Sequence, residues 1–127
     1  MTAPVWMEDI VGAFGKAAGI PGFTLGERGV AALTFENGFT LRFEYAAGKL
    51  VVEMSVPSRL DSAKAKALLA YSHPKAAGGL HVRTGYLRRR GAAVFAVLLG
   101  ERDATLPVVN QAFSALWRIA QEFGGAS

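Results

Sequence analysis

Residues 33–57 read LTFENGFTLRFEYAAGKLVVEMSVP, and this stretch decides the fold class. Apolar and polar residues alternate on both sides of Asn37-Gly38, which is the period of half-buried strands. Asn-Gly favours the type I′ turn of a two-residue hairpin. A second turn at residues 46–48 leads into another alternating run, which ends at Pro57 because proline cannot donate to a strand ladder. The stretch therefore predicts three consecutive antiparallel strands, the first over residues 33–36.

A helix is predicted before these strands, over residues 5–18. Its apolar positions recur at spacings of three and four, as an amphipathic helix requires: Trp6, Ile10, Ala13, Phe14 and Ala17. A glycine-rich loop joins it to the first strand. Gly15-Lys16 does not belong to a phosphate loop, because Ile10 and Ala17 replace the glycine and hydroxyl residue of that motif. We interpret the glycines at 12, 15 and 19 as points of close approach to another element or of fraying at the helix end.

A short second helix is predicted after Pro57. Ser58 with Asp61 resembles a helix start of the capping-box kind, and His73-Pro74 ends the helical pattern. Its apolar face is expected to hold Leu60, Ala63, Ala67, Leu68 and Tyr71.

Two further strands and a closing helix complete the chain. The strands are expected over residues 80–86 and 92–99, with a turn at residues 88–91. The second of them is apolar on both faces, which predicts a central position or an interface. Asp103 or Thr105 is expected to cap the closing helix.

The predicted order of elements is therefore α-β-β-β-α-β-β-α. This order indicates an α+β fold, with an antiparallel five-stranded twisted sheet packed by helices. A chain of 127 residues is the usual size of one domain, so we expect a single domain over residues 1–127.

The composition excludes several classes of protein. Apolar residues make up 51% of the chain and charged residues 19%, which is unlike a disordered chain. Cysteine is absent, which excludes disulfide scaffolds and thiol catalysis. The longest apolar run, residues 92–99, is too short to span a bilayer as a helix. Glu8 and Asp9 are unlike the basic start of a signal peptide, so we expect a cytoplasmic protein.

Reactive chemistry is scarce in this sequence. Its two histidines and ten carboxylates are scattered, and neighbours such as Ser72-His73 seldom point at each other as a triad requires. His81 has no second ligand at metal-binding spacing. We therefore expect neither an enzyme nor a metal or cofactor site.

Positive charge is concentrated in the middle of the chain. Residues 57–90 hold eight bases, among them Arg83 and Arg88 to Arg90, against only Asp61. An electrostatic partner should meet this segment, and an acidic partner is one hypothesis for it. Nucleic acid is less favoured because Tyr86 is the only aromatic residue among these arginines. Whether the segment faces an acidic regulator or only solvent stays open.

Apolar residues exceed what the predicted core faces need. Val5, Val11, Val51 and Leu69 fall off those faces, so they either form a partner surface or belong to a core whose faces are drawn differently. Small residues on the second helix, Ala63, Ala67 and Ala70, would let a second copy approach closely. Dimerisation is therefore a sequence-based hypothesis.

The order of elements resembles the class I chaperones of bacterial type III secretion, the CesT/SycE-like group. The likeness rests on the helix at residues 7–18 with its glycine-rich loop and on four motifs: LTFENGFTLRFEY at 33–45, KLVVEMSVP at 49–57, KALLAYSH at 66–73 and FSALWRIAQEF at 113–123. The resemblance implies a non-enzymatic homodimer that binds the N-terminal region of a secreted effector. It would keep this cargo soluble and ready for export without ATP. The resemblance leaves open whether the basic segment at residues 57–90 faces this cargo or a secretion ATPase.

The resemblance also implies two sets of contacts. Cargo contacts would fall on the first helix and the adjoining sheet, at Val5, Trp6, Val11, Leu33 and Leu41. The dimer contact would fall on the second helix and the fifth strand, at Leu68, Leu69, Tyr71, Val94 and Ala96.

Two other functions remain as alternatives. One is a small basic nucleic-acid-binding or regulatory module that acts through Arg83 and Arg88 to Arg90, whose binding would weaken in salt. The other is a ligand-binding or enzymatic α+β domain with an apolar pocket under the first helix.

Overall fold

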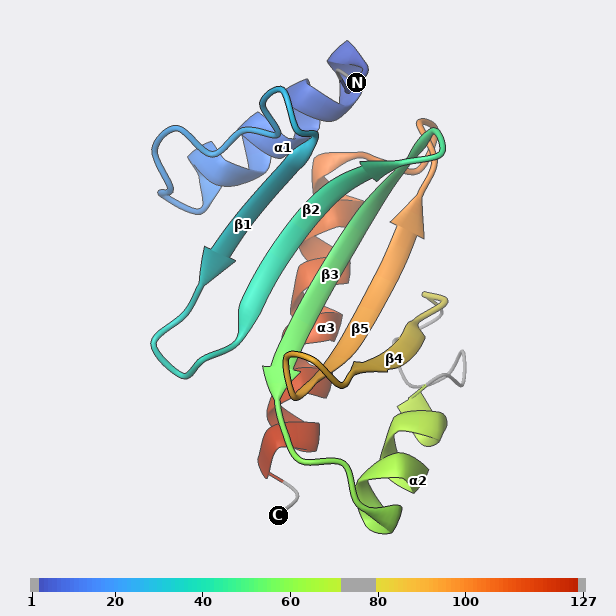
Figure 1. Cartoon of the computed structure of the whole chain (residues 1–127). Coiled ribbons are helices and arrows are strands. Elements are labelled where there is room, and N and C mark those ends of the chain that lie inside the picture. Colours follow the sequence, from blue (N-terminus) through green and yellow to red (C-terminus); the bar gives the residue numbers. More distant parts are fainter. Residues whose placement is uncertain (1–2, 72–79, 126–127) are drawn as a thin grey trace.

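The computed structural model describes residues 3–71 and 80–125. Its elements follow the predicted order α-β-β-β-α-β-β-α (Figure 1). They are α1 (Val5–Ala17), β1 (Val30–Thr34), β2 (Thr40–Ala46), β3 (Lys49–Pro57), α2 (Ser62–Tyr71), β4 (Arg83–Leu87), β5 (Ala92–Leu99) and α3 (Leu106–Gly125).

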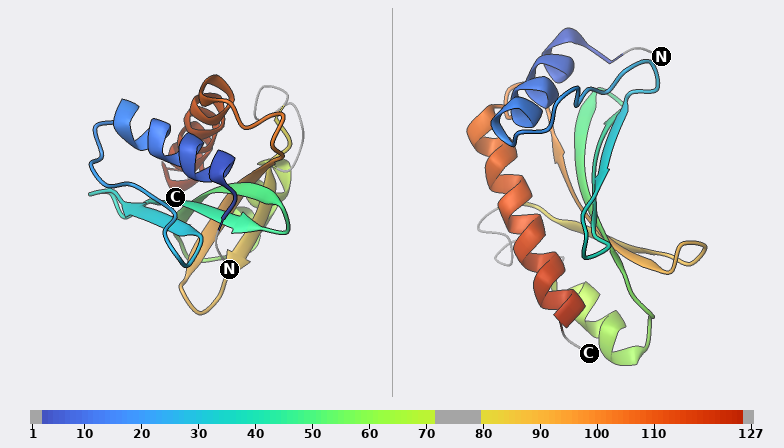
Figure 2. Two further views of the ribbon diagram at one scale, coloured as in Figure 1. Left: turned by 90° about the horizontal axis from the view of Figure 1, so that it is seen from above. Right: turned by 90° about the vertical axis from the view of Figure 1, so that its left-hand side faces the viewer.

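The strands form one antiparallel sheet in the order β1-β2-β3-β5-β4. Because β5 pairs with β3 on one side and β4 on the other, the prediction of a central fifth strand is confirmed. Helices α1 and α3 cover one face of the sheet, and no helix covers the opposite face in the described part of the chain (Figure 2). We call this opposite side the helix-free face. Helix α2 lies beyond the end of β3, near β4 and α3.

The core lies between the sheet and the two covering helices. Side chains on β3 alternate between the two faces, so that Leu50, Val52, Met54 and Val56 are buried. Helix α3 supplies the opposite wall with Val109, Ala112, Leu116, Ile119 and Phe123. The strand pattern of residues 39–57 was therefore sufficient to predict the buried face of β2 and β3.

The prediction of a type I′ turn at Asn37-Gly38 is wrong. Only Gly38 has a positive φ, at 90°, whereas a type I′ turn needs two positive φ angles. Phe35 N–H donates to the Phe39 carbonyl at 2.8 Å, and the Asn37 side chain accepts a hydrogen bond from Phe39 N–H. These local bonds favour a three-residue loop, in which the asparagine side chain takes the place of a backbone acceptor.

A pair of positive φ angles occurs instead between β2 and β3. Ala47 has a φ of 51° and Gly48 a φ of 76°. Alanine is strained there because its Cβ crowds the backbone, whereas asparagine adopts this region more readily. We expect Ala47→Asn to raise the free energy of unfolding by about 0.5–1 kcal/mol in urea titration. Ala46→Asn, at an exposed strand position with ordinary φ, is the matched control, and an equal gain there would contradict this explanation.

The ends of the helices have identifiable caps. Helix α1 ends in a Schellman motif, in which Gly19 has a φ of 73° and Ile20 N–H donates to the Gly15 carbonyl at 2.8 Å. Asp61 caps α2 by accepting from Lys64 N–H at 2.8 Å, so the predicted role of Ser58 in that cap is wrong. Thr105 caps α3 rather than Asp103.

Other differences concern strand bounds and glycines. Strand β1 begins at Val30 and ends before Phe35, and β4 begins at Arg83 rather than at residue 80.

A Cβ on Gly15 would lie 2.6 Å from the Phe23 Cβ, which confirms the predicted close approach. A Cβ on Gly12 would meet no atom within 4 Å, so that glycine has no such role. The predicted helix end at His73-Pro74 lies outside the described residues.

Candidate functional site

An apolar pocket lies between the end of α1, the start of α3 and strands β1 and β2. We call it the α1–β1 pocket; its volume is about 440 Å³. Its lining is apolar except for one amide: Phe14, Ala17, Ala18, Ile20, Leu33, Phe35, Leu41, Asn110 and Phe113. A pocket of this size and character suits apolar side chains of a ligand or partner.

Edge-to-face contacts between aromatic rings pack the wall of this pocket. The Phe14 ring centroid lies 5.0 Å from that of Phe43 and 5.6 Å from that of Phe113, both edge-to-face. Phe35 contacts Trp117 in the same geometry at 4.9 Å. Such pairs contribute about 0.5–1.5 kcal/mol each beyond the burial of their area. The pocket is therefore formed before any ligand enters.

Strand β1 is an edge of the sheet, and its edge faces away from β2 beside the pocket. Gly29 and Phe35 bond to β2, because Tyr45 N–H donates to the Gly29 carbonyl and Phe35 N–H to the Phe39 carbonyl, each at 2.8 Å. Backbone groups alternate sides along an antiparallel strand, so those of Ala32 and Thr34 point away from β2. The pocket residue Leu33 lies between them, which places the unpaired backbone and the apolar lining side by side.

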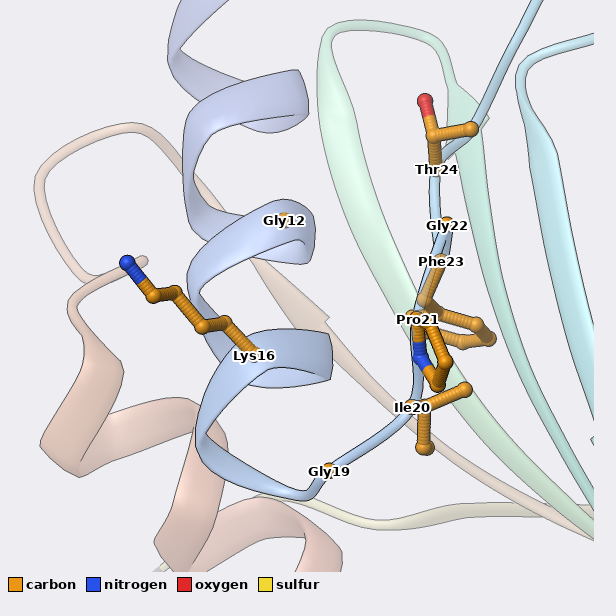
Figure 3. Close-up of a pocket in the computed structure, with 8 residues that line it drawn as sticks. All are labelled: Gly12, Lys16, Gly19, Ile20, Pro21, Gly22, Phe23 and Thr24. Carbon is orange, nitrogen blue, oxygen red and sulfur yellow. The ribbon is translucent and has the colours of Figure 1, made fainter.

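A second pocket, of about 540 Å³, lies between α1 and the loop that follows it (Figure 3). It is lined by Gly12, Lys16, Gly19, Ile20, Pro21, Gly22, Phe23 and Thr24, and Ile20 lines the α1–β1 pocket as well. In Figure 3 the Lys16 side chain points away from the loop. Glu8 holds the loop against α1, because its carboxylate accepts from Leu25 N–H and the Thr24 hydroxyl at 3.0 Å.

The predicted cargo residues divide into three groups. Leu33 and Leu41 both line the α1–β1 pocket, with Leu41 fully buried at its floor. Val5 is 75% exposed at the other end of α1, and Trp6 is half-buried and packs against the core. Val11 is fully buried in the core, so its prediction as a surface contact is wrong.

The structure also shows pocket residues that the sequence analysis did not assign to a site. Phe35, Ile20 and Phe113 come from three segments far apart in the chain. The sequence around each of them is that of an ordinary core or loop residue. No local pattern therefore predicts that the three line one pocket.

The predicted dimer residues also divide. Leu68 is buried, and Tyr71 packs its ring on Phe95 at 5.8 Å while its hydroxyl donates to Glu122 at 3.2 Å. Burial and the neighbouring Glu122 carboxylate raise the pKa of Tyr71. The expectation that Leu68 faces a partner is therefore wrong, because it contributes to the core. Leu69 is 74% exposed.

Val94 and Ala96 are half-buried and lie on the helix-free face. They belong to β5, where Phe95 between them points into the core. Alternation along the strand therefore directs these two predicted dimer residues to the side that no helix covers.

The predicted basic residues are all exposed, and the fold brings three of them together. Arg88, Arg89 and Arg90 form the tip of the β4–β5 hairpin, where Gly91 has a φ of 60°. They line a hollow with Arg42 and Glu53 on the helix-free face, whereas Arg83 does not contribute to it.

Glu53 in this hollow gives the protein a pH-dependent stability. Burial raises the pKa of Glu53 from 4.5, against the opposing effect of the Arg42 guanidinium. The folded state therefore holds this proton more tightly than the unfolded state, and stability falls as pH rises above about 4.5 through the raised pKa. We expect Glu53→Gln to be more stable than the natural chain in urea at pH 7. The difference in stability between the two chains should vanish near pH 4. An unchanged difference at that pH would contradict the raised pKa of Glu53 as its cause.

No group of three or more metal-binding side chains occurs within residues 3–71 and 80–125. In the same ranges, no helix has the length and apolar character needed to cross a membrane.

The match to a known family decides what kind of protein this is. A family model described as type III secretory system chaperone SycN matches residues 6–124. The chain belongs to this chaperone family. It is 31% identical over 120 residues to the chaperone protein SycN of Yersinia pseudotuberculosis serotype I (strain IP32953), covering 92% of this chain and 95% of the relative. The SycN protein of Yersinia enterocolitica serotype O:8 gives the same identity and coverage.

Several solved structures have the same fold. The ExsC–ExsE complex gives a TM-score of 0.80 at 17% identity, covering 99% of this chain and 96% of that one. The HopA1–SchA chaperone–effector complex gives 0.77 at 14% identity, covering 96% and 95%. The heterodimeric ExoU–SpcU complex of Pseudomonas aeruginosa gives 0.65 at 16% identity, covering 94% and 95%. The family and fold implied by the resemblance are thus confirmed.

Proposed function

We propose that this chaperone acts as a cytoplasmic homodimer that binds an extended N-terminal segment of a secreted effector, without catalysis and without ATP. The observation that carries the proposal is the α1–β1 pocket beside the unpaired edge of β1. One similar solved structure is by its own description a chaperone–effector complex, which supports an effector as the partner.

The geometry suits an extended segment. A cargo strand that pairs with Ala32 and Thr34 would place alternate side chains toward the helices, beside Leu33. One apolar side chain entering the pocket would contribute about 1.5–3 kcal/mol through burial. Ordering the cargo costs about 1–2 kcal/mol per residue, so affinity stays moderate and release needs no nucleotide.

Blocking the pocket tests this proposal. Ala17 is exposed at the pocket rim, so Ala17→Trp fills the pocket and leaves the core intact. We expect the affinity for the N-terminal segment of an effector that co-purifies with the chain to fall about tenfold or more, which is the loss of one buried apolar side chain. Isothermal titration calorimetry with the purified segment measures this change.

The matched control for that variant is Gln121→Trp, which adds the same ring at an exposed position of α3 away from the pocket. It should bind as the natural chain does. Equal affinity of the Ala17→Trp variant would refute the pocket as the cargo site. Trp6→Asp is a poorer test because Trp6 packs against the core, so a charge there also lowers stability.

A second copy of the chain is the proposed partner of α2. Leu69 is the exposed large apolar residue within Ser62–Tyr71, and its buried neighbour Leu68 fixes the helix to the core. An exposed leucine on a rigid helix stabilises a twofold contact in which the same patch meets itself. Val94 and Ala96 extend the proposed contact along β5.

A further inference from the structure

The β4–β5 hairpin projects from the sheet on the side opposite α1 and α3 (Figure 2). Its turn passes in front of the end of β3 in Figure 1. Between this turn and the sheet lies a hollow of about 610 Å³, lined by Arg42, Glu53, Tyr86, Leu87, Arg88, Arg89 and Arg90. We call it the arginine hollow. It lies on the other face of the sheet from the α1–β1 pocket.

We propose that the arginine hollow is a second docking site, which takes an acidic segment of a partner protein. Four of its seven lining residues are arginines and one is a carboxylate. Arg88, Arg89 and Arg90 are exposed, and none of them forms an ion pair within residues 3–71 and 80–125. Three guanidiniums on one turn attract carboxylates and pair with them in bidentate geometry.

The floor of the hollow has an unsatisfied donor. Arg42 pairs with Glu44 at 3.0 Å through one terminal nitrogen, whereas its Nε is buried and has no hydrogen-bond partner in the part of the chain that the structure describes. Glu53 lies opposite Arg42 in the β2–β3 register. Glu44 and Glu53 therefore balance the charge of Arg42, and the net positive charge of the hollow comes from Arg88, Arg89 and Arg90.

The hairpin is held in place before binding. The Tyr86 hydroxyl donates to the Ser58 carbonyl at 2.7 Å, and Ser58 N–H donates to the Gly91 carbonyl at 2.8 Å. These bonds join both strands of the hairpin to the segment that follows β3. Little conformational entropy is then lost when a partner meets the arginines.

A protein segment fits the hollow better than nucleic acid does. Tyr86 is the one aromatic residue among those that line the hollow, and its hydroxyl is engaged with Ser58, whereas single-stranded nucleic acid is bound by stacking on several aromatic rings. An apolar side chain adjoins the arginines, because Leu87 lines the hollow with them and is 41% exposed. A segment that combines acidic and aliphatic residues matches this surface.

Fluorescence anisotropy with a labelled peptide of alternating glutamate and leucine tests the proposal, with a lysine–leucine peptide as the charge-inverted probe. We expect the acidic peptide to bind and the basic one not to bind. Binding should weaken severalfold between about 50 and about 500 mM salt, because exposed charges are screened. Equal binding of both peptides, or tighter binding of a single-stranded oligonucleotide, would overturn the proposal.

Variants separate the hollow from general charge effects. Arg88→Ala with Arg89→Ala and Arg90→Ala should lower affinity for the acidic peptide about tenfold, given about 0.2–1 kcal/mol per exposed pair. The triple variant of Lys16, Arg28 and Arg102 to alanine removes the same charge at exposed positions outside the hollow, and it should bind normally. Equal losses in both triple variants would refute a specific site.

Glu53→Gln is expected to change affinity for the acidic peptide in the opposite direction. Removing the only carboxylate among the residues that line the hollow should raise affinity severalfold, which a merely structural role of Glu53 would not do.

Ala17→Trp, which blocks the α1–β1 pocket, should leave binding of the acidic peptide unchanged. A loss in that variant without a loss in the arginine triple variant would place the peptide at the pocket and overturn the second site. Light scattering of each variant checks that its oligomeric state is unchanged.

Discussion

Phe43→Ala lowers the free energy of unfolding by about 3–5 kcal/mol, the usual range for an aromatic residue lost from a core. Phe43 is fully buried on β2, and its ring lies 5.0 Å from that of Phe14 and 5.6 Å from that of Phe23. Its removal leaves a cavity where α1, the glycine-rich loop and the sheet meet. A loss of this size is a large part of the total stability of a domain, which is about 5–15 kcal/mol.

Urea titration followed by circular dichroism measures this change. Phe35→Ala is the matched control. Because Phe35 is only half-buried, this variant should lose clearly less free energy of unfolding. A loss below about 1 kcal/mol for Phe43→Ala would mean that the surrounding rings close the cavity and that the aromatic cluster is not rigid.

Leu69→Asp converts the proposed homodimer into a monomer. Leu69 is 74% exposed, so a carboxylate there is harmless to the isolated chain. Buried at a twofold contact, two such carboxylates would face each other without water, at a cost of several kcal/mol. Light scattering at micromolar concentration should give a mass of 13.4 kDa for the variant and twice that value for the natural chain.

Val5→Asp is the matched control for this prediction. Val5 is 75% exposed on α1, so the change has the same chemistry and exposure at a site outside the proposed dimer contact. The two variants should differ in mass, because Val5→Asp stays a dimer and Leu69→Asp does not. A natural chain that is monomeric at every concentration would refute the homodimer, and a dimeric Leu69→Asp variant would move the contact away from α2.

Most of the fold followed from periodicity. The alternation in residues 39–57 determined which side chains of β2 and β3 are buried, because a strand places successive side chains on opposite faces. The doubly apolar run at residues 92–99 indicated the central strand, since only a strand covered by neighbours tolerates apolar residues on both faces. Turn type was less predictable, because the Asn37 side chain accepts the Phe39 N–H and stabilises a longer loop.

The sites depended on contacts that no local pattern encodes. Val11 falls outside the predicted apolar stripe of the first helix, yet it is fully buried in the core. The α1–β1 pocket needs Leu33, Ile20 and Phe113 from three separate segments.

The arginine hollow shows the same division between sequence and structure. The cluster Arg88 to Arg90 was visible in the sequence, but its meeting with Arg42 and Glu53 was not. By itself, the sequence determined the elements, their order, the central strand and the absence of cysteine chemistry, because these depend on residues close along the chain. Only the tertiary structure decided which surfaces are hollow and which charges face each other, because those properties arise where distant segments pack.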